Sequence, residues 1–145
     1  MKKFIMSLFM LVVLAATVSA QTDKIVGEWK TIDDKTGSEK SIVNIFKATN
    51  GKYYGKVEKL FKNPEKRCTE CEGANKDKPV VGLLVVNGME EKNGNLTNGT
   101  ILDPADGKVY KCNISFESKS GKLKVRGSLD KHGIIGRTQY WSRVK

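Results

Sequence analysis

The residues best suited to chemistry in this chain are two closely spaced cysteines, Cys68 and Cys71, which form a Cys-x-x-Cys motif. Such a motif can be a structural disulfide, a redox-active pair or part of a zinc site. A redox pair usually starts a helix, which lowers the thiol pKa, and no helical pattern surrounds Cys68. Zinc needs about four ligands. We favour a structural disulfide, in which one of the two cysteines is paired with the other or with Cys112.

The other ionisable residues give little support for catalysis. His132 is the single histidine and lies in a Lys-His-Gly turn without a neighbouring nucleophile or orienting acid. Asp103 and Asp106 lie on either side of Pro104-Ala105, where carboxylates ordinarily bond turn amides. Phosphate-binding and dinucleotide-binding motifs are absent from the sequence. We therefore predict no catalytic residue, no metal site and no cofactor.

These residues must be positioned by short β-strands. Apolar and polar residues alternate from Tyr110 to Phe116 and again from Lys122 to Arg126, which is typical of strands with one buried face. Asn50-Gly51 favours a type I′ hairpin turn. Since helical periodicity is lacking, we predict an all-β fold, a single antiparallel up-and-down barrel with room for side chains or one small ligand. The expected strands are about 24–32, 39–47, 52–61, 79–87, 96–102, 108–117, 122–129 and 134–143.

One segment interrupts this rhythm. Residues 62–78 are poor in apolar side chains and contain Cys68 and Cys71. A loop of this length in a compact domain is usually functional or disordered. The two cysteines favour an ordered loop.

The first twenty residues have the features of a signal peptide. Lys2 and Lys3 precede an apolar run from Phe4 to Ala16, and small residues follow at Val18-Ser19-Ala20. The apolar run is too short to span a bilayer. We predict a cleaved signal peptide at residues 1–20 and an exported domain at residues 21–145, periplasmic or extracellular and not membrane-spanning.

The formal net charge of the chain is +10. Such a balance can favour anionic partners, but the lysines are scattered through every segment, which is typical of a solvated basic surface. Together with export, this argues against a nucleic-acid partner.

Several segments carry a resemblance to known families. Gly27-x-Trp29 resembles the Gly-x-Trp of lipocalins and other calycins, in which the Trp closes one end of the barrel and a late Arg stacks on it. Arg137 and Arg143 have the strand parity for that role. More widely, the chain resembles a family of exported bacterial proteins known only as a domain of unknown function, number twenty-one forty-seven. The matching segments are 25–29, 51–57, 68–73, 76–83, 101–104 and 136–141.

This resemblance implies a calycin-like barrel and no particular activity. Many members lack a cysteine at the position of Cys112, which favours pairing of Cys68 with Cys71. Cys112, on the apolar face of its strand, is then expected to be a buried free thiol.

The leading hypothesis is a non-enzymatic binding module for a small apolar or amphipathic ligand at the barrel mouth. The alternative is an envelope interaction or scaffold protein with a solid barrel, which docks on another envelope protein through residues 62–78. The residues expected to contact a ligand share an aromatic or polar character and an inward parity. They are Trp29, Tyr53, Tyr110, Arg137, Gln139 and Trp141.

Overall fold

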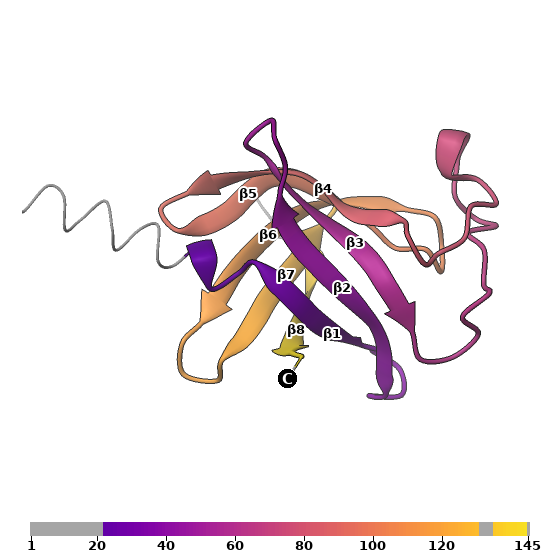
Figure 1. The fold of residues 1–145 in the computed structure, drawn as a ribbon, viewed down its shortest axis with the longest axis horizontal. Helices are drawn as coiled ribbons and strands as arrows, with labels where there is room; N and C mark the ends of the chain where they lie inside the picture. The colour runs from indigo at the N-terminus through magenta and orange to yellow at the C-terminus, as the bar shows by residue number, and fades with distance from the viewer. Residues whose placement is uncertain (1–21, 131–134, 145) are drawn as a thin grey trace, which may run out of the picture.

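Within residues 22–130 and 135–144, which the computed structural model describes, the chain folds into eight antiparallel strands that close into one barrel (Figure 1). Each strand pairs with the next, and β8 returns to β1 by placing Arg143 opposite Trp29. The predicted all-β, up-and-down barrel is confirmed. The strands are β1 (Gly27–Ile32), β2 (Glu39–Lys47), β3 (Tyr53–Leu60), β4 (Leu84–Lys92), β5 (Asn95–Leu102), β6 (Val109–Glu117), β7 (Lys122–Ser128) and β8 (Gly136–Arg143).

Alternating burial creates the barrel interior. In β2, Ser41, Val43 and Ile45 are buried, whereas the residues between them are partly exposed. In β6, Cys112 and Ile114 are buried, whereas Lys111 and Asn113 beside them are exposed. A side-chain period of two gives every strand one inner and one outer face, so closure buries one face of all strands at once.

The fourth strand begins later than the sequence suggests. We expected a strand over 79–87, but β4 spans Leu84–Lys92. Val80 and Leu83 are buried in the preceding turn, where Leu83 N donates to Val80 O and Leu83 O accepts from Val57 N. These two residues are therefore apolar because they pack beneath a loop, and not because they belong to a strand.

Two Asn-Gly pairs make different turns. The expected type I′ turn at Asn50-Gly51 is wrong, because only Gly51 of the pair has a positive φ, at 84°. There the loop has an extra residue, and the hydrogen bond from Gly51 N to Ala48 O places the glycine in a bulge after the turn. Asn93 and Gly94 both have positive φ, at 54° and 83°, as a type I′ turn requires.

The barrel has two dissimilar ends (Figure 1). One end carries the β1–β2, β5–β6 and β7–β8 connections and the long segment 61–83, which lies at the right of the figure with the short 3-10 helix η1 (Gly73–Asn75). The other end carries the residues before β1 and the β2–β3, β4–β5 and β6–β7 turns. We call them the open end and the closed end.

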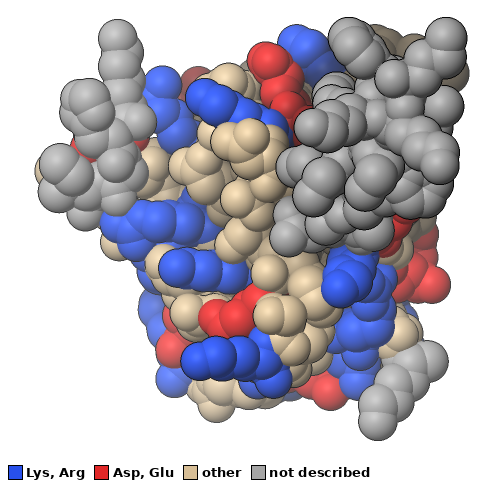
Figure 2. Space-filling view, turned by 90° about the vertical axis from the view of Figure 1, so that its left-hand side faces the viewer, with Lys and Arg blue, Asp and Glu red and all other residues tan. Residues whose placement is uncertain are grey.

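The predicted signal peptide at residues 1–20 and the turn at His132 lie outside the described residues. In the part that is described, helices long and apolar enough to cross a membrane are absent. Figure 2 looks onto the left-hand side of Figure 1 and shows Lys and Arg side chains spread over the described surface, with acidic and uncharged residues between them.

Candidate functional site

A cavity of about 540 Å³ occupies the open half of the barrel. Its walls come from inward-facing residues of the strands, and its rim from the β1–β2 and β5–β6 turns and Lys66 of the long loop. The inner wall is mostly apolar. It is formed by Val43, Val57, Val85, Ile101, Val125 and Trp141.

The cavity ends half-way along the barrel. On β6, Tyr110 lines the cavity, whereas Cys112, two residues further, is 1% exposed and does not. On β2 the same boundary lies between Val43 and Ile45. Beyond it, the closed half is filled by side chains that are at most 1% exposed: Trp29, Ile45, Met89, Leu96, Cys112, Ile114 and Leu123.

Trp29 seals the closed end. Its indole is fully buried, and Nε1 donates to Ile25 O at 2.8 Å. The guanidinium of Arg143 lies 4.1 Å from the ring centroid and donates to Val26 O and Lys24 O. Gly27 has a φ of 129°, and a Cβ there would lie 2.5 Å from Arg143 Nη1. The expected burial of Trp29 under an Arg of the last strand is confirmed, and the glycine of Gly-x-Trp makes room for that Arg.

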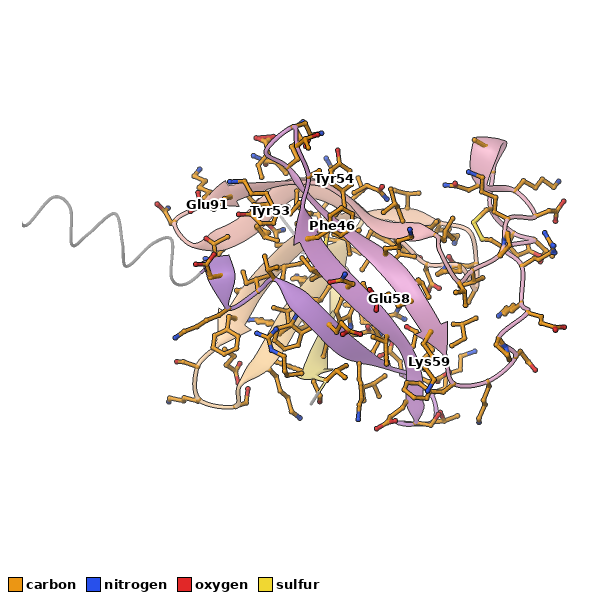
Figure 3. All side chains as sticks on the ribbon, in the orientation of Figure 1. Phe46, Tyr53, Tyr54, Glu58, Lys59 and Glu91 are labelled. Carbon is orange, nitrogen blue, oxygen red and sulfur yellow. A yellow bond between two sulfur atoms is a disulfide. The ribbon has the colours of Figure 1, made fainter. Side chains whose placement is uncertain are left out.

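Tyr53 also lies in the closed half, away from the cavity. It is 6% exposed, pairs with Met89 across the β3–β4 ladder, and burial raises its pKa. Figure 3 shows it near Glu91, toward the end opposite the long loop. Of the six residues expected to contact a ligand, Trp29 and Tyr53 are therefore placed outside the cavity, and the other four lie on its wall.

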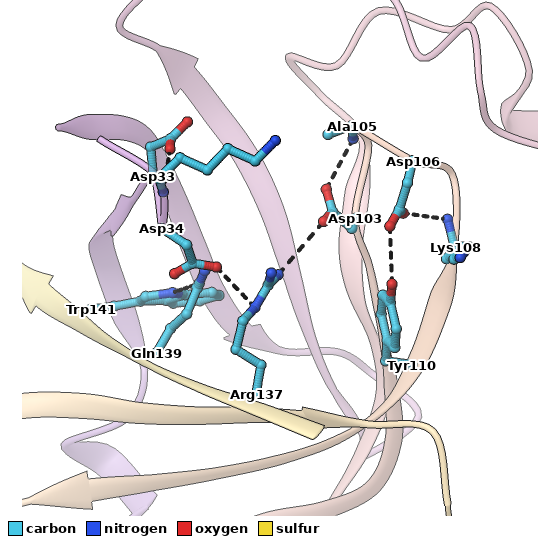
Figure 4. Close-up of polar contacts among 11 residues, drawn as sticks. Asp33, Asp34, Asp103, Ala105, Asp106, Lys108, Tyr110, Arg137, Gln139 and Trp141 are labelled. Atoms are coloured by element: carbon cyan, nitrogen blue, oxygen red, sulfur yellow. Dashed lines mark hydrogen bonds and ion pairs between the residues drawn. The ribbon is translucent and has the colours of Figure 1, made fainter. Parts of the chain in front are cut away.

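Arg137 spans the rim of the cavity (Figure 4). Its Nε lies 2.8 Å from Asp34 Oδ2, on the β1–β2 turn, and its Nη2 lies 3.7 Å from Asp103 Oδ2, on the β5–β6 turn. Its side chain is 63% exposed. A single guanidinium thus faces two turns that are far apart in the sequence.

Two further polar side chains line the wall below the rim. Gln139 Oε1 accepts from Trp141 Nε1 at 3.1 Å, which fixes the indole at the inner end of the cavity. Tyr110 donates its hydroxyl to Asp106 Oδ2 at 3.0 Å. Burial and that hydrogen bond raise the pKa of Tyr110, so the phenol stays neutral at physiological pH.

The turn carboxylates bond backbone amides, as the sequence predicts. Asp103 Oδ1 accepts from Ala105 N at 2.9 Å, and Asp106 Oδ1 accepts from Lys108 N at 2.8 Å. Asp33 Oδ1 accepts from the amides of Lys35 and Thr36, and these bonds lower the pKa of Asp33. These hydrogen bonds hold the turns at the rim in shape.

Cys68 and Cys71 form a disulfide, which confirms the expected pairing. Both are buried, and Cys68 Sγ lies 3.7 Å from Pro104 O, so the disulfide packs the long loop against the β5–β6 turn at the rim. Cys112 is a buried free thiol, and burial raises its pKa to about 12. Among the described residues, groups of three or more Cys, His, Asp or Glu side chains suited to a metal ion are absent.

The comparisons with known proteins agree with this architecture. Residues 27–143 match the family described as uncharacterized protein conserved in bacteria (DUF2147). The chain belongs to this family. The match covers all the strands named above, so the family's shared unit is the barrel itself.

A solved structure supports the fold of this DUF2147 barrel. Protein HP1028 from the human pathogen Helicobacter pylori, described as a member of the lipocalin family, superposes with a TM-score of 0.71 at 23% identity. The alignment covers 83% of this chain and 82% of that one. A search of curated proteins found no match.

Sequence reasoning missed the partners of Arg137 in this DUF2147 barrel. In the sequence, Asp34 lies between the expected strands 24–32 and 39–47, and Asp103 is expected to bond only turn amides. The sequence indicates that Arg137 faces inward on the last strand. It does not indicate that the two turns with Asp34 and Asp103 reach Arg137 across the mouth, because strand pairing alone does not set the direction in which a turn projects.

Proposed function

We propose that this domain is an exported, non-enzymatic binding module that holds one small apolar or amphipathic ligand in the open half of its barrel. The observation that carries the proposal is the cavity of about 540 Å³ with an apolar inner wall and a few polar side chains. Small-molecule sites are typically concave, about 300–1,000 Å³ and mostly apolar, with few orienting polar groups.

The alternative of a solid interaction barrel has less support. It requires an interior filled by the protein's own side chains, and only the closed half is filled in that way. The loop that would dock a partner contributes Lys66 to the rim and packs against the β5–β6 turn. Its position thus fits the building of the cavity mouth.

The disulfide supports the exported part of the proposal. Disulfides persist in oxidising compartments and are rare where glutathione and thioredoxin keep thiols reduced. Cys68 and Cys71 are joined, whereas Cys112 is isolated in the core, where it is protected from exchange. This arrangement suits a domain that folds and works outside the cytoplasm.

The most informative experiment is native mass spectrometry of the protein purified from its own host. We expect an added mass that denaturation releases. In parallel, the neutral fluorophore N-phenyl-1-naphthylamine should bind the purified protein and be displaced by the host ligand.

A graded pair of variants locates the binding. Gly127 lines the cavity, and a Cβ there would meet Ile101 and Tyr110 at ordinary contact distances of 3.4 and 3.5 Å. Gly127→Ala should keep fluorophore binding, whereas Gly127→Leu should narrow the cavity and weaken fluorophore binding without unfolding the protein. If Gly127→Leu binds as well as wild type, or if the native protein is always empty and takes up no fluorophore, the proposal is wrong.

A further inference from the structure

We propose that the ligand is an anionic acyl amphiphile, whose oxyanion head binds Arg137 at the rim and whose carbonyl accepts a hydrogen bond from Gln139. This inference rests on the proposed function and adds to it the charge and the shape of the ligand. Three observations carry it: the donors left over on Arg137, the state of the other charges at the rim, and the spacing along β8.

The guanidinium of Arg137 is only partly used. Its Nε is bonded to Asp34, and its Nη2 lies 3.7 Å from Asp103, too far for a hydrogen bond. Within residues 22–130 and 135–144, Nη1 has no recorded partner. The Nη1–Nη2 edge can therefore take a carboxylate or phosphate in the two-pronged geometry that arginine favours, while Nε keeps its bond to Asp34.

The remaining rim charges favour an anion. Asp33 and Asp103 already accept hydrogen bonds from turn amides, and Asp34 is bound by Arg137. The rim lysines are exposed, and in the described structure their ammonium groups have no recorded ion pair. These are Lys35, Lys40 and Lys66. Together with Arg137, the cavity lining carries four basic and three acidic side chains, a formal excess of one positive charge.

A cationic head group would bind at the rim less favourably than an anionic one. To bind Asp34 it would have to displace the guanidinium of Arg137 at 2.8 Å, and it would then sit among the rim lysines. Breaking one ion pair to form another gains little, whereas an anion adds contacts without breaking the existing one.

The third observation is the row of inward residues on β8. Arg137, Gln139 and Trp141 all line the cavity and follow each other at every second position. Neighbours in such a row lie about 7 Å apart. Gln139 uses its oxygen for Trp141, and among the described residues its amide NH₂ has no recorded partner. A carbonyl several bonds below the oxyanion would meet this donor, and the chain beyond it would lie on Trp141 and the valines of the inner wall.

The first experiment compares twelve-carbon probes with different heads, each competing below its micellar concentration with N-phenyl-1-naphthylamine on the full exported domain. The probes are dodecanoate, dodecyl phosphate, dodecanol and dodecyltrimethylammonium. We expect both anions to bind about tenfold or more tightly than the alcohol, as a charge-assisted hydrogen bond allows, and the cation to bind more weakly than either anion. The ratio of dodecanoate to dodecyl phosphate distinguishes a carboxylate ligand from a phosphate ligand.

Variants of Arg137 test the head-group site. Arg137→Gln should remove the preference for anions, so that dodecanoate and dodecyl phosphate bind no more tightly than dodecanol. Arg137→Lys should restore it in part, because the charge remains but the paired donors do not. Lys124→Gln removes a positive charge from an exposed position of β7 and should change nothing. The anion preference of wild type should also weaken in high salt.

Gln139→Glu tests the second contact, because it keeps the acceptor for Trp141 and removes the donors. N-dodecanoylglycine, which carries a carbonyl below its carboxylate, should bind wild type about fivefold more tightly than dodecanoate, and this ratio should fall to about one in the variant. Charge repulsion from the new carboxylate acts on both probes and cancels in the ratio.

The outcomes separate the two proposals. If every probe binds with the same affinity, or the cation binds best, the anionic assignment is wrong while the binding function stands. If Gln139→Glu leaves the ratio unchanged, the carbonyl contact is wrong. If no probe displaces the fluorophore and none binds directly, both proposals fail together.

Discussion

Each end of the barrel carries an arginine from the same face of β8, and the two arginines make different contacts. Arg143 lies over the buried ring of Trp29 and donates to two backbone carbonyls at the closed end. Arg137, six residues earlier, faces two carboxylates across the rim of an open cavity. The residue type and the strand parity are the same. The difference comes from the groups that face each arginine, which are an indole and backbone carbonyls for Arg143 and two carboxylates for Arg137.

This contrast shows how one small barrel combines stability with a site. The closed half contains a dense set of buried apolar side chains around Trp29, and the open half keeps the cavity and most of the polar lining. Residues of the closed half should therefore control folding, and residues of the open half should control binding. The predictions below test this division, from the largest expected effect to the smallest.

Replacement of Trp29 should have the largest effect. Trp29→Ala removes a fully buried indole and should lower the free energy of unfolding by about 3–5 kcal/mol, close to the whole stability of an ordinary domain. Tyr140→Ala, at a position 42% exposed on β8, serves as control and should cost less than about 1 kcal/mol. Urea denaturation followed by circular dichroism measures both. A Trp29→Ala protein with the same urea midpoint as wild type would show that the closed end is not the stable half.

The two arginines provide the sharpest comparison. Arg143→Gln loses the contact with Trp29 and the bonds to Val26 and Lys24, and should cost about 1–2 kcal/mol. Arg137→Gln loses only exposed ion pairs and should cost about 0.5 kcal/mol or less. Equal losses in stability in the same denaturation series would contradict the division between the ends.

Removal of the disulfide should act mainly on the open end. Because the ring between Cys68 and Cys71 is short, Cys68→Ser with Cys71→Ser should lower global stability by about 2 kcal/mol or less. The long loop should become the first site of trypsin cleavage, since the covalent link that holds its shape is lost. Mass spectrometry of early fragments locates the cuts. Early cleavage in β1 or β8 instead would mean that the disulfide also holds the barrel closed.

The titration of Cys112 tests whether the closed half is filled and excludes water. Burial raises its pKa to about 12, above the ordinary thiol value, so the folded state favours the neutral thiol. The resulting stabilisation is complete below the unfolded pKa of about 8.5 and is lost as the pH rises toward the folded pKa, by about 1.4 kcal/mol per pH unit. Unfolding of Cys112→Ala should therefore depend less on pH than that of wild type between about pH 9 and 11.

Thiol counting gives an independent check on Cys112. The native protein should show no accessible thiol and the denatured protein one, because Cys68 and Cys71 are joined. A reactive thiol in the native protein would mean that solvent enters the closed half.

The sequence predicted most of the fold and part of the cavity. Alternation along β6 and β7 is a local property, and it indicates which side chains face inward before any pairing is known. The sequence misplaced the start of β4, because Val80 and Leu83 are buried by a loop and not by a sheet. It also assigned the type I′ turn to Asn50-Gly51, since an extra residue in a turn leaves no signal in the dipeptide itself.

By itself, the sequence determined the strand periodicity, the inward parity of Arg137, Gln139, Trp141 and Arg143, and the chemical character of the Cys-x-x-Cys loop. Only the tertiary structure decided that Trp29 lies in the filled half and Trp141 at the cavity wall, and that Asp34 and Asp103 meet Arg137. Periodicity assigns a side chain to a face of its strand. Its depth along the barrel and its partner across the mouth depend on strand stagger and closure, which involve all the strands together.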